Sequence, residues 1–121
     1  MPKDPRHHLG RLGEQLAAEH LQRLGYAIAA RNHRTRFGEL DLVAADDETL
    51  VFCEVKTRRG RGDPWQGLHP GKRAQVRRMA RAYLADVRDR PRPPRLRFDA
   101  IGVVLDPQGR LVRLDHVQDA F

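Results

Sequence analysis

The pattern of hydrophobic and polar positions divides the chain into seven elements. Leucine and alanine recur at three- and four-residue steps from Leu9 to Leu24, which predicts an amphipathic helix of about four turns that ends at Gly25. A second such pattern predicts a helix that starts at 70–72 and reaches Arg88. Apolar and alternating runs predict strands over 26–32, 40–45, 50–57, 96–105 and 110–117.

The element order α-β-β-β-α-β-β predicts one α/β domain over residues 1–121. Residues 1–8 are polar with two prolines and are expected to be frayed and flexible. Residues 89–95 contain three prolines, so they form a stiff connector rather than helix. The Gly- and Pro-rich loop at 58–71 is long for a compact domain, which favours a functional role.

Several classes of protein are excluded by the composition. No apolar run exceeds five residues, so neither a transmembrane helix nor a signal peptide is expected. The single cysteine, Cys53, excludes an intramolecular disulfide and a CxxC zinc site, and no histidine pair has HxxxH spacing. We therefore expect a cytoplasmic protein with no membrane partner, in which Cys53 is a small core residue.

Positive charge gathers in one part of the chain. The net charge is +7, but residues 58–97 hold 13 basic and three acidic side chains, a net charge of +10. Such clustering favours nucleic acid as the partner over a general arginine-rich background, although 20 of the 23 basic residues are arginine. The candidate phosphate contacts, which could instead form a solvated face, are Arg58, Arg59, Lys72, Arg73, Arg77 and Arg78. Trp65 either stacks on a base or caps the core.

The two central strands suggest an acidic site. A turn centred between Asp47 and Glu48 pairs positions that sum to 95, which puts Leu40, Leu42 and Ala44 on one face. The same register sets Asp41 opposite Glu54, and a divalent cation would offset the repulsion of these carboxylates. Mg²⁺ or Mn²⁺ suits such oxygen ligands.

Lys56 lies two positions after Glu54 and shares its face of the strand. A lysine beside a metal-binding carboxylate pair suits phosphodiester hydrolysis, because it can position water and counter charge on phosphate. The alternative is a solvated hairpin on which Lys56 pairs with Glu39. Glu14 lies at the edge of the apolar stripe of the first helix, beside Gly10 and Gly13. Either these small neighbours let it approach the acidic site, or it is an ordinary residue at the boundary of the core. Asp99 either pairs with an arginine or supports the site.

Three ordered motifs resemble those of a known nuclease superfamily. They are G-x-x-G-E-x-x-A at 10–17, G-E-L-D-L at 38–42 and F-C-E-V-K-T-R at 52–58. With R-F-D at 97–99 and H-V-Q-D-A-F at 116–121, they are similar to the PD-(D/E)xK superfamily. Within it, the chain most resembles the bacterial YraN-type endonuclease-like family, relatives of archaeal Holliday-junction resolvases.

The resemblance implies a restriction-endonuclease-like fold, in which helices flank a central mixed sheet. It implies that Asp41, Glu54 and the Val55 carbonyl hold the metal ion, that Lys56 is catalytic and that Glu14 completes the site. It also suggests a homodimer. The first hypothesis is thus a metal-dependent endonuclease acting on DNA, with branched or structured DNA as the favoured substrate. The alternatives are a nucleic-acid-binding module without catalysis, and a domain that binds an acidic protein.

Overall fold

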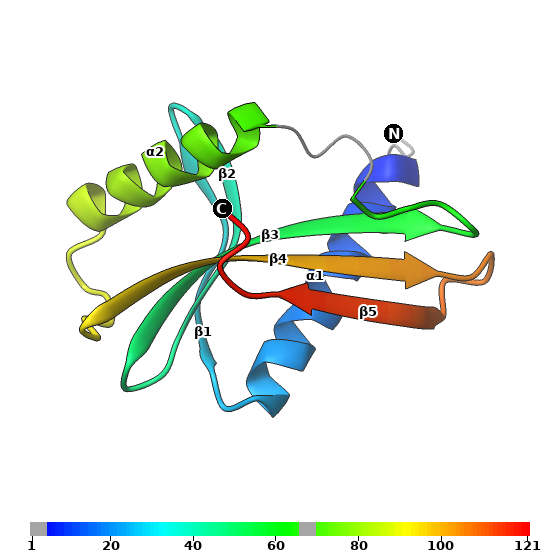
Figure 1. Ribbon diagram of the computed structural model, residues 1–121, viewed down its shortest axis with the longest axis horizontal. Helices are drawn as coiled ribbons and strands as arrows, with labels where there is room; N and C mark the ends of the chain where they lie inside the picture. The colour runs from blue at the N-terminus through cyan, green and yellow to red at the C-terminus, as the bar shows by residue number, and fades with distance from the viewer. Residues whose placement is uncertain (1–4, 66–69) are drawn as a thin grey trace.

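The computed structural model describes residues 5–65 and 70–121 and forms one five-stranded mixed sheet with a helix on each face (Figure 1). The strands lie in the order β1-β2-β3-β4-β5, antiparallel except for the parallel pair β3–β4. The helices are α1 (Pro5–Arg23) and α2 (Pro70–Asp86). The strands are β1 (Ala27–Thr35), β2 (Gly38–Ala45), β3 (Thr49–Arg59), β4 (Arg95–Leu105) and β5 (Leu111–Val117). The predicted element order and the α/β, restriction-endonuclease-like fold are confirmed.

Two hydrophobic cores hold the helices to the sheet. Under α1, alanines and leucines of the helix pack against alternate positions of β2, β3 and β4, and we call this the α1-side core. Under α2, Val76, Met79 and Tyr83 pack against the opposite face, the α2-side core. Cys53 is buried in the α1-side core, as predicted. The sheet is thus covered on both faces, as expected for strands with near-continuous apolar sequence.

The predicted β2–β3 register is confirmed over the apolar part of the hairpin. Leu42 pairs with Cys53 and Ala44 with Val51, so paired positions sum to 95. The turn is fixed by Asp46, whose carboxylate accepts hydrogen bonds from the backbone N–H groups of Glu48 (2.9 Å) and Thr49 (2.8 Å). Side-chain capping of this kind is why aspartate favours turns.

The ends of some elements differ from the prediction. Helix α1 begins at Pro5, so residues 5–8 are helical rather than frayed; residues 1–4 lie outside the described part of the chain. Proline is well suited to a first helical turn, because it has no N–H group to leave unpaired. Strand β3 continues to Arg59, so the glycine-rich loop is shorter than expected, and its residues 66–69 are not described.

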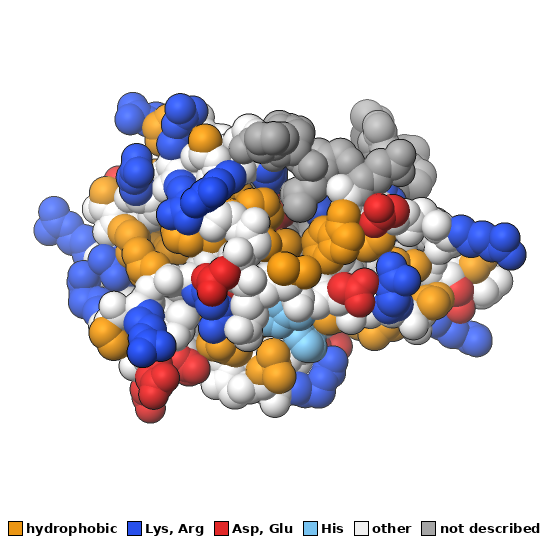
Figure 2. All heavy atoms as spheres, in the orientation of Figure 1, with side chains coloured by type: hydrophobic (Ala, Val, Ile, Leu, Met, Phe, Trp, Pro, Cys, Tyr) orange, Lys and Arg blue, Asp and Glu red, His pale blue; other side chains and the backbone are white. Residues whose placement is uncertain are grey.

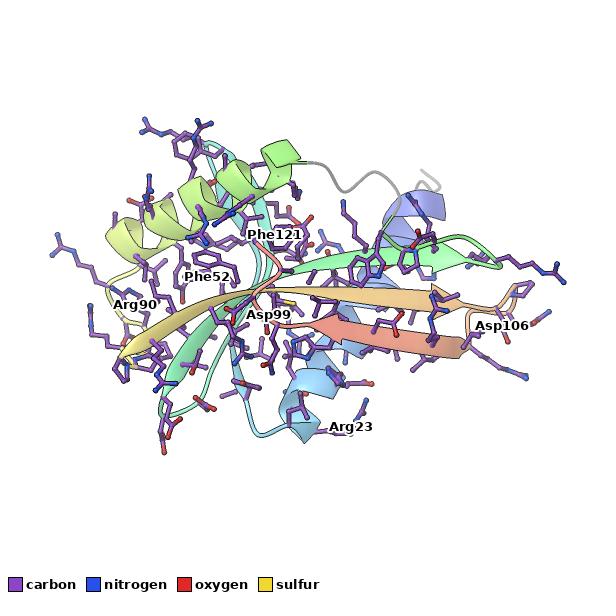
Figure 3. All side chains as sticks on the ribbon, viewed as in Figure 1. Arg23, Phe52, Arg90, Asp99, Asp106 and Phe121 are labelled. Carbon is purple, nitrogen blue, oxygen red and sulfur yellow. The ribbon has the colours of Figure 1, made fainter. Side chains whose placement is uncertain are left out.

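The loop and the C-terminal tail contribute to the core. A Cβ at Gly102 of β4 would lie 2.9 Å from Pro64 and 3.0 Å from Trp65, so Trp65 packs closely over the sheet. This supports the capping role of Trp65 rather than base stacking. The tail crosses the sheet beside α2, where Phe121 is 9% exposed and lies beneath the helix (Figures 1 and 3).

Candidate metal centre

Three carboxylates from different parts of the chain meet beside the sheet. Glu14 of α1 and Glu39 and Asp41 of β2 each offer an oxygen, and these atoms all lie within 4.8 Å of one another. All three side chains are partly buried. Among the side chains that the structure describes, at residues 8–65 and 71–121, no other three acidic, histidine or cysteine side chains come together in this way. We call these residues the acidic cluster.

Glycine allows α1 to bring Glu14 to the sheet. A Cβ at Gly13 would collide with the side chain of Thr57 on β3, so only glycine permits this approach of helix and strand. The predicted role of the small residues beside Glu14 is therefore confirmed for Gly13, whereas Gly10 has open space beside it.

Asn32 of β1 holds the Glu14 carboxylate. Its Nδ2 atom donates a hydrogen bond of 2.9 Å to Glu14 Oε1. Asn32 has a backbone φ of +49°, in the left-handed region that asparagine tolerates better than most residues. In the β1–β2 register it stands opposite Asp41, between the pairs Arg31–Leu42 and His33–Leu40.

The alternation of β2 side chains between the two faces of the sheet is shifted by one residue at Asp41, a change of phase. Leu42 and Ala44 pack in the α1-side core, but Leu40 packs in the α2-side core with Val43. The prediction that Leu40 shares a face with Leu42 and Ala44 is therefore wrong. The change of phase leaves the next side chain, Glu39, on the α1 side, where it meets Glu14.

Asp41 occupies the point where β2 parts from β3. The paired ladder ends at Leu42–Cys53, one position short of the predicted Asp41–Glu54 pair. Instead, the backbone N–H of Val55 donates a hydrogen bond of 2.8 Å to Asp41 Oδ2. Burial raises the pKa of Asp41 to about 8, and the nearby charge of Glu54 adds to this effect. Without a cation, this carboxyl group therefore retains a proton at neutral pH.

Glu54 lies on the α2 side with two lysines. Its side chain is 7% exposed, and its Oε1 atom lies 2.8 Å from Lys72 Nζ and 3.7 Å from Lys56 Nζ. Lys72 comes from the first turn of α2, so the helix supplies the main counter-charge for this buried carboxylate. Lys56 is more accessible, with 32% of its side chain exposed.

The structure brings together most of the predicted catalytic residues. Asp41 interacts with Glu14 and Glu54, and Lys56 adjoins Glu54, but Glu54 is not within the 4.8 Å cluster. Glu39 was expected only as a partner of Lys56, and its place in the cluster was missed. The pattern of apolar residues does not indicate the change of phase at Asp41 that turns Glu39 toward Glu14. Asn32 was also missed as a residue of the site. The only feature of the sequence that could have indicated it is an asparagine at the position opposite Asp41. The Val55 carbonyl as a ligand stays a prediction.

The predicted phosphate contacts fall into three groups. Arg59, Arg73 and Arg78 are exposed, and Arg58 is exposed with its Nε atom 3.4 Å from the Asp63 carbonyl oxygen. Arg77 makes contacts within the fold. It donates a hydrogen bond of 2.9 Å to the Phe121 carbonyl, and its guanidinium lies 4.5 Å from the centre of the Phe98 ring. Lys72 points to Glu54.

A second polar network lies on the α1 side of the sheet, around Asp99 near the centre of β4 (Figure 3). Arg97 donates hydrogen bonds of 2.9 Å to both carboxylate oxygens and another to the Tyr26 hydroxyl. His116 Nε2 lies 2.8 Å from Asp99 Oδ2, and its Nδ1 atom lies 3.0 Å from His20 Nε2. Burial opposes ionisation of Asp99, but the His116 and Arg97 contacts outweigh it and lower the pKa. The pairing of Asp99 with an arginine is confirmed.

The acidic cluster is suited to a hard divalent cation. Carboxylate oxygens from three side chains match the preference of Mg²⁺ and Mn²⁺, and a cation would offset the burial and the Glu54 charge that raise the pKa of Asp41. The identity of the metal is not specified by these residues.

None of the described helices is long and apolar enough to cross a membrane.

Comparisons with known proteins give one consistent family. Residues 13–103 match the model of the uncharacterised protein family UPF0102. A UPF0102 protein of Symbiobacterium thermophilum is 49% identical over 115 residues, 93% of this chain and 95% of the relative. One of Parafrankia sp. is 47% identical over 116 residues, with 93% and 95% covered. One of Chlorobium limicola is 42% identical over 127 residues, with 100% and 96% covered. The chain therefore belongs to the UPF0102 family, in agreement with its YraN-type motifs.

Proposed function

We propose that this protein is a divalent-metal-dependent endonuclease that hydrolyses phosphodiester bonds in DNA. The acidic cluster of Glu14, Glu39 and Asp41 carries this proposal. Glu54 and Lys56 extend the cluster along β3, in the order that the nuclease resemblance requires. The concentration of charge strengthens it, because a cluster of this kind without a cation is electrostatically unfavourable.

Each group in the site has a distinct task in this reaction. Mg²⁺ or Mn²⁺ held by the carboxylates would polarise the phosphate and lower the pKa of bound water. The hydrogen bond from the Val55 N–H fixes the orientation of the Asp41 carboxylate. Glu54 holds the Lys56 ammonium near the site, and the exposed part of Lys56 can orient water and counter the charge on phosphate oxygens.

The basic face of α2 supports nucleic acid as the substrate. Figure 2 shows Lys and Arg side chains spread over the end of the molecule that carries α2, with hydrophobic side chains between them. Arg73 and Arg78 are exposed on this helix, which begins at the acidic site with Lys72. Phosphates bound along α2 would therefore lead toward the carboxylates.

A cleavage assay tests this function. Duplex, flap and four-way-junction DNAs are incubated with Mg²⁺ or Mn²⁺, and we expect cleavage of at least one of them. Asp41→Asn and Glu39→Gln should each reduce the rate at least about 100-fold, since each removes a cation ligand. Asp47→Asn, which neutralises an exposed acid of the β2–β3 turn, is the matched control. Cleavage that persists in Asp41→Asn and Glu39→Gln would contradict the proposal.

One observation favours a second function, nucleic-acid binding without cleavage. Lys72 Nζ lies 2.8 Å from Glu54, so a fixed ammonium already supplies the positive charge that this carboxylate needs. A binding module of this kind would bind DNA without metal, with the affinity falling as salt rises by a log–log slope of about −0.9 per phosphate contact. Metal-independent binding with no cleavage of the whole DNA panel would favour this second function.

A further inference from the structure

A groove separate from the acidic cluster lies between the β1–β2 turn and the outer face of α2. Its volume is about 530 Å³, and it is open to solvent. Arg36 and Phe37 of the turn form one wall, and Arg78, Arg81 and two alanines of α2 form the other. A single acidic residue, Asp86, lies at one end. The groove is thus positively charged, with an aromatic ring and two alanines in its walls.

The groove is held open by the way the turn docks on α2. Gln75 of α2 donates a hydrogen bond of 2.9 Å to the Phe37 carbonyl. Gly38 has a φ of +134°, and a Cβ there would lie 2.7 Å from Gln75 Nε2 and 3.1 Å from Met79 Sδ. Glycine at this position therefore lets the turn contact the helix, and the Gln75 hydrogen bond fixes it there. A preformed groove loses less conformational entropy when a ligand binds.

The cations of the groove are available to a ligand. Arg78 and Arg81 are exposed and stand three residues apart, on the same face of α2. Within the described part of the chain, neither they nor Arg36 lies within ion-pair distance of an acidic side chain. The Arg36 guanidinium lies 4.9 Å from the centre of the half-buried Phe37 ring.

This combination is suited to an unstacked nucleotide. The Phe37 ring and the Arg36 guanidinium over it both offer a planar surface on which a base can stack, and neighbouring arginines bind its phosphates. We propose that the groove binds one unpaired nucleotide of single-stranded nucleic acid, with the base against Phe37 and the phosphates on Arg78 and Arg81. A fully paired duplex cannot present a base to Phe37 without losing its stacking.

The groove and the acidic cluster share the same turn. Phe37 and Glu39 are two residues apart, and only Gly38 separates them. Two residues span at most about 7 Å of chain, so the turn brings the groove close to the acidic cluster. If the proposed cleavage occurs, on which this step rests, the groove selects substrates with an unpaired nucleotide beside the bond that is cut.

Binding without metal tests the groove independently of cleavage. Fluorescence anisotropy with EDTA present would compare a labelled oligothymidine of about 15 nucleotides with a duplex of equal length. Phe37→Leu removes the ring but keeps an apolar side chain in the α2-side core, which Phe37 partly contacts, and Phe37→Tyr keeps the ring. We expect Phe37→Leu to weaken single-strand binding about tenfold, Phe37→Tyr to restore it, and both to leave duplex binding within about twofold.

The arginines require a charge-matched control. Arg78→Ala/Arg81→Ala should weaken single-strand binding and lower its salt slope by about 1.4, the value for two phosphate contacts. Arg23→Ala/Arg110→Ala removes the same charge from exposed positions at the end of α1 and in the β4–β5 turn. Equal losses in the two double variants, or equal losses on single strand and duplex in Phe37→Leu, would overturn the proposal. So would polyglutamate that competes as well as oligothymidine. Absence of cleavage would count against the proposed function and leave these binding results unchanged.

Discussion

The backbone N–H of Val55 donates a 2.8 Å hydrogen bond to the carboxylate of Asp41, at the point where strands β2 and β3 separate. A side chain thus replaces the backbone partner that a continued ladder would provide. This bond fixes Asp41 between two groups of charges, Glu14 and Glu39 on one side and Glu54 with its lysines on the other. Asp41 is therefore the residue on which the candidate site depends most.

Neutralising Asp41 should stabilise the metal-free protein. Burial and the charge of Glu54 raise the pKa of Asp41, so the ionised form is unfavourable there. Asp41→Asn keeps an acceptor for the Val55 N–H and removes the free-energy cost of holding this buried carboxyl group protonated at neutral pH. We expect the free energy of unfolding to rise by about 1–2 kcal/mol and Tm by roughly 4 °C or more, measured with EDTA present.

Metal addition separates this effect from ordinary stabilisation. The wild-type protein should gain Tm as Mg²⁺ or Mn²⁺ is added, because a ligand that binds only the folded state stabilises it. Asp41→Asn should lose that gain, whereas the exposed control Asp47→Asn should keep it. An equal metal-dependent gain in Asp41→Asn would show that the cation binds elsewhere.

Removing the Lys72 ammonium should destabilise the fold and tighten metal binding. Glu54 is 7% exposed, and Lys72→Gln leaves it with only the more distant Lys56, which we expect to cost about 1–3 kcal/mol. The freed carboxylate can then contribute to a cation site, so the Mn²⁺ Kd measured by calorimetry should fall. Arg73→Gln removes the same charge from an exposed neighbour. Unchanged Mn²⁺ affinity in Lys72→Gln would exclude Glu54 as a ligand.

Two glycines of α1 should respond in opposite ways to alanine. A Cβ at Gly13 would collide with Thr57, so Gly13→Ala should cost about 2 kcal/mol or more and move Glu14 away from Asp41. A Cβ at Gly10 meets nothing within 4 Å, so Gly10→Ala should stabilise the helix by about 0.5–1 kcal/mol. Urea unfolding of both variants measures this difference. Similar losses in both would contradict the close approach of α1 to β3.

The His20–His116 pair should make stability depend on pH. Burial, followed by the charges of His116 and Arg23, lowers the pKa of His20 below its usual 6.5. The unfolded chain therefore takes up the proton first, so this contribution is present above about pH 6.5 and is lost as the pH falls below it. The urea midpoint should fall from about pH 7.5 to about pH 5.5, and less steeply in His20→Gln. An identical pH profile in His20→Gln would contradict this role.

The sequence predicted the fold well because hydrophobic alternation determines how strands pair. The pairing of Leu42 with Cys53 followed from the need to bury both side chains on one face. The same reasoning failed at Leu40, where a change of phase lets another apolar side chain enter the opposite core. Apolar pattern cannot distinguish the two outcomes, because leucine fits either core.

The site was harder to predict because its members come from five elements, α1, β1, β2, β3 and α2. Asp41 and Glu54 follow from one hairpin register, but Asn32 and Lys72 reach the site through tertiary packing of β1 and α2. Tertiary packing also explains why the prediction for Arg77 as a phosphate contact was not supported. Its neighbours suggest a phosphate contact, yet it binds the carbonyl of Phe121, 44 positions away. Only the position of the C-terminal tail reveals this contact.

The location of a bound cation tests the central claim most directly. A crystal structure of the protein grown with Mn²⁺, with anomalous scattering to identify the ion, would show which oxygens it contacts. We expect one Mn²⁺ bound by Asp41 together with Glu14 and Glu39. A structure with Mn²⁺ bound elsewhere, or with the three carboxylates free of metal and Lys72 still paired with Glu54, would contradict the proposed centre.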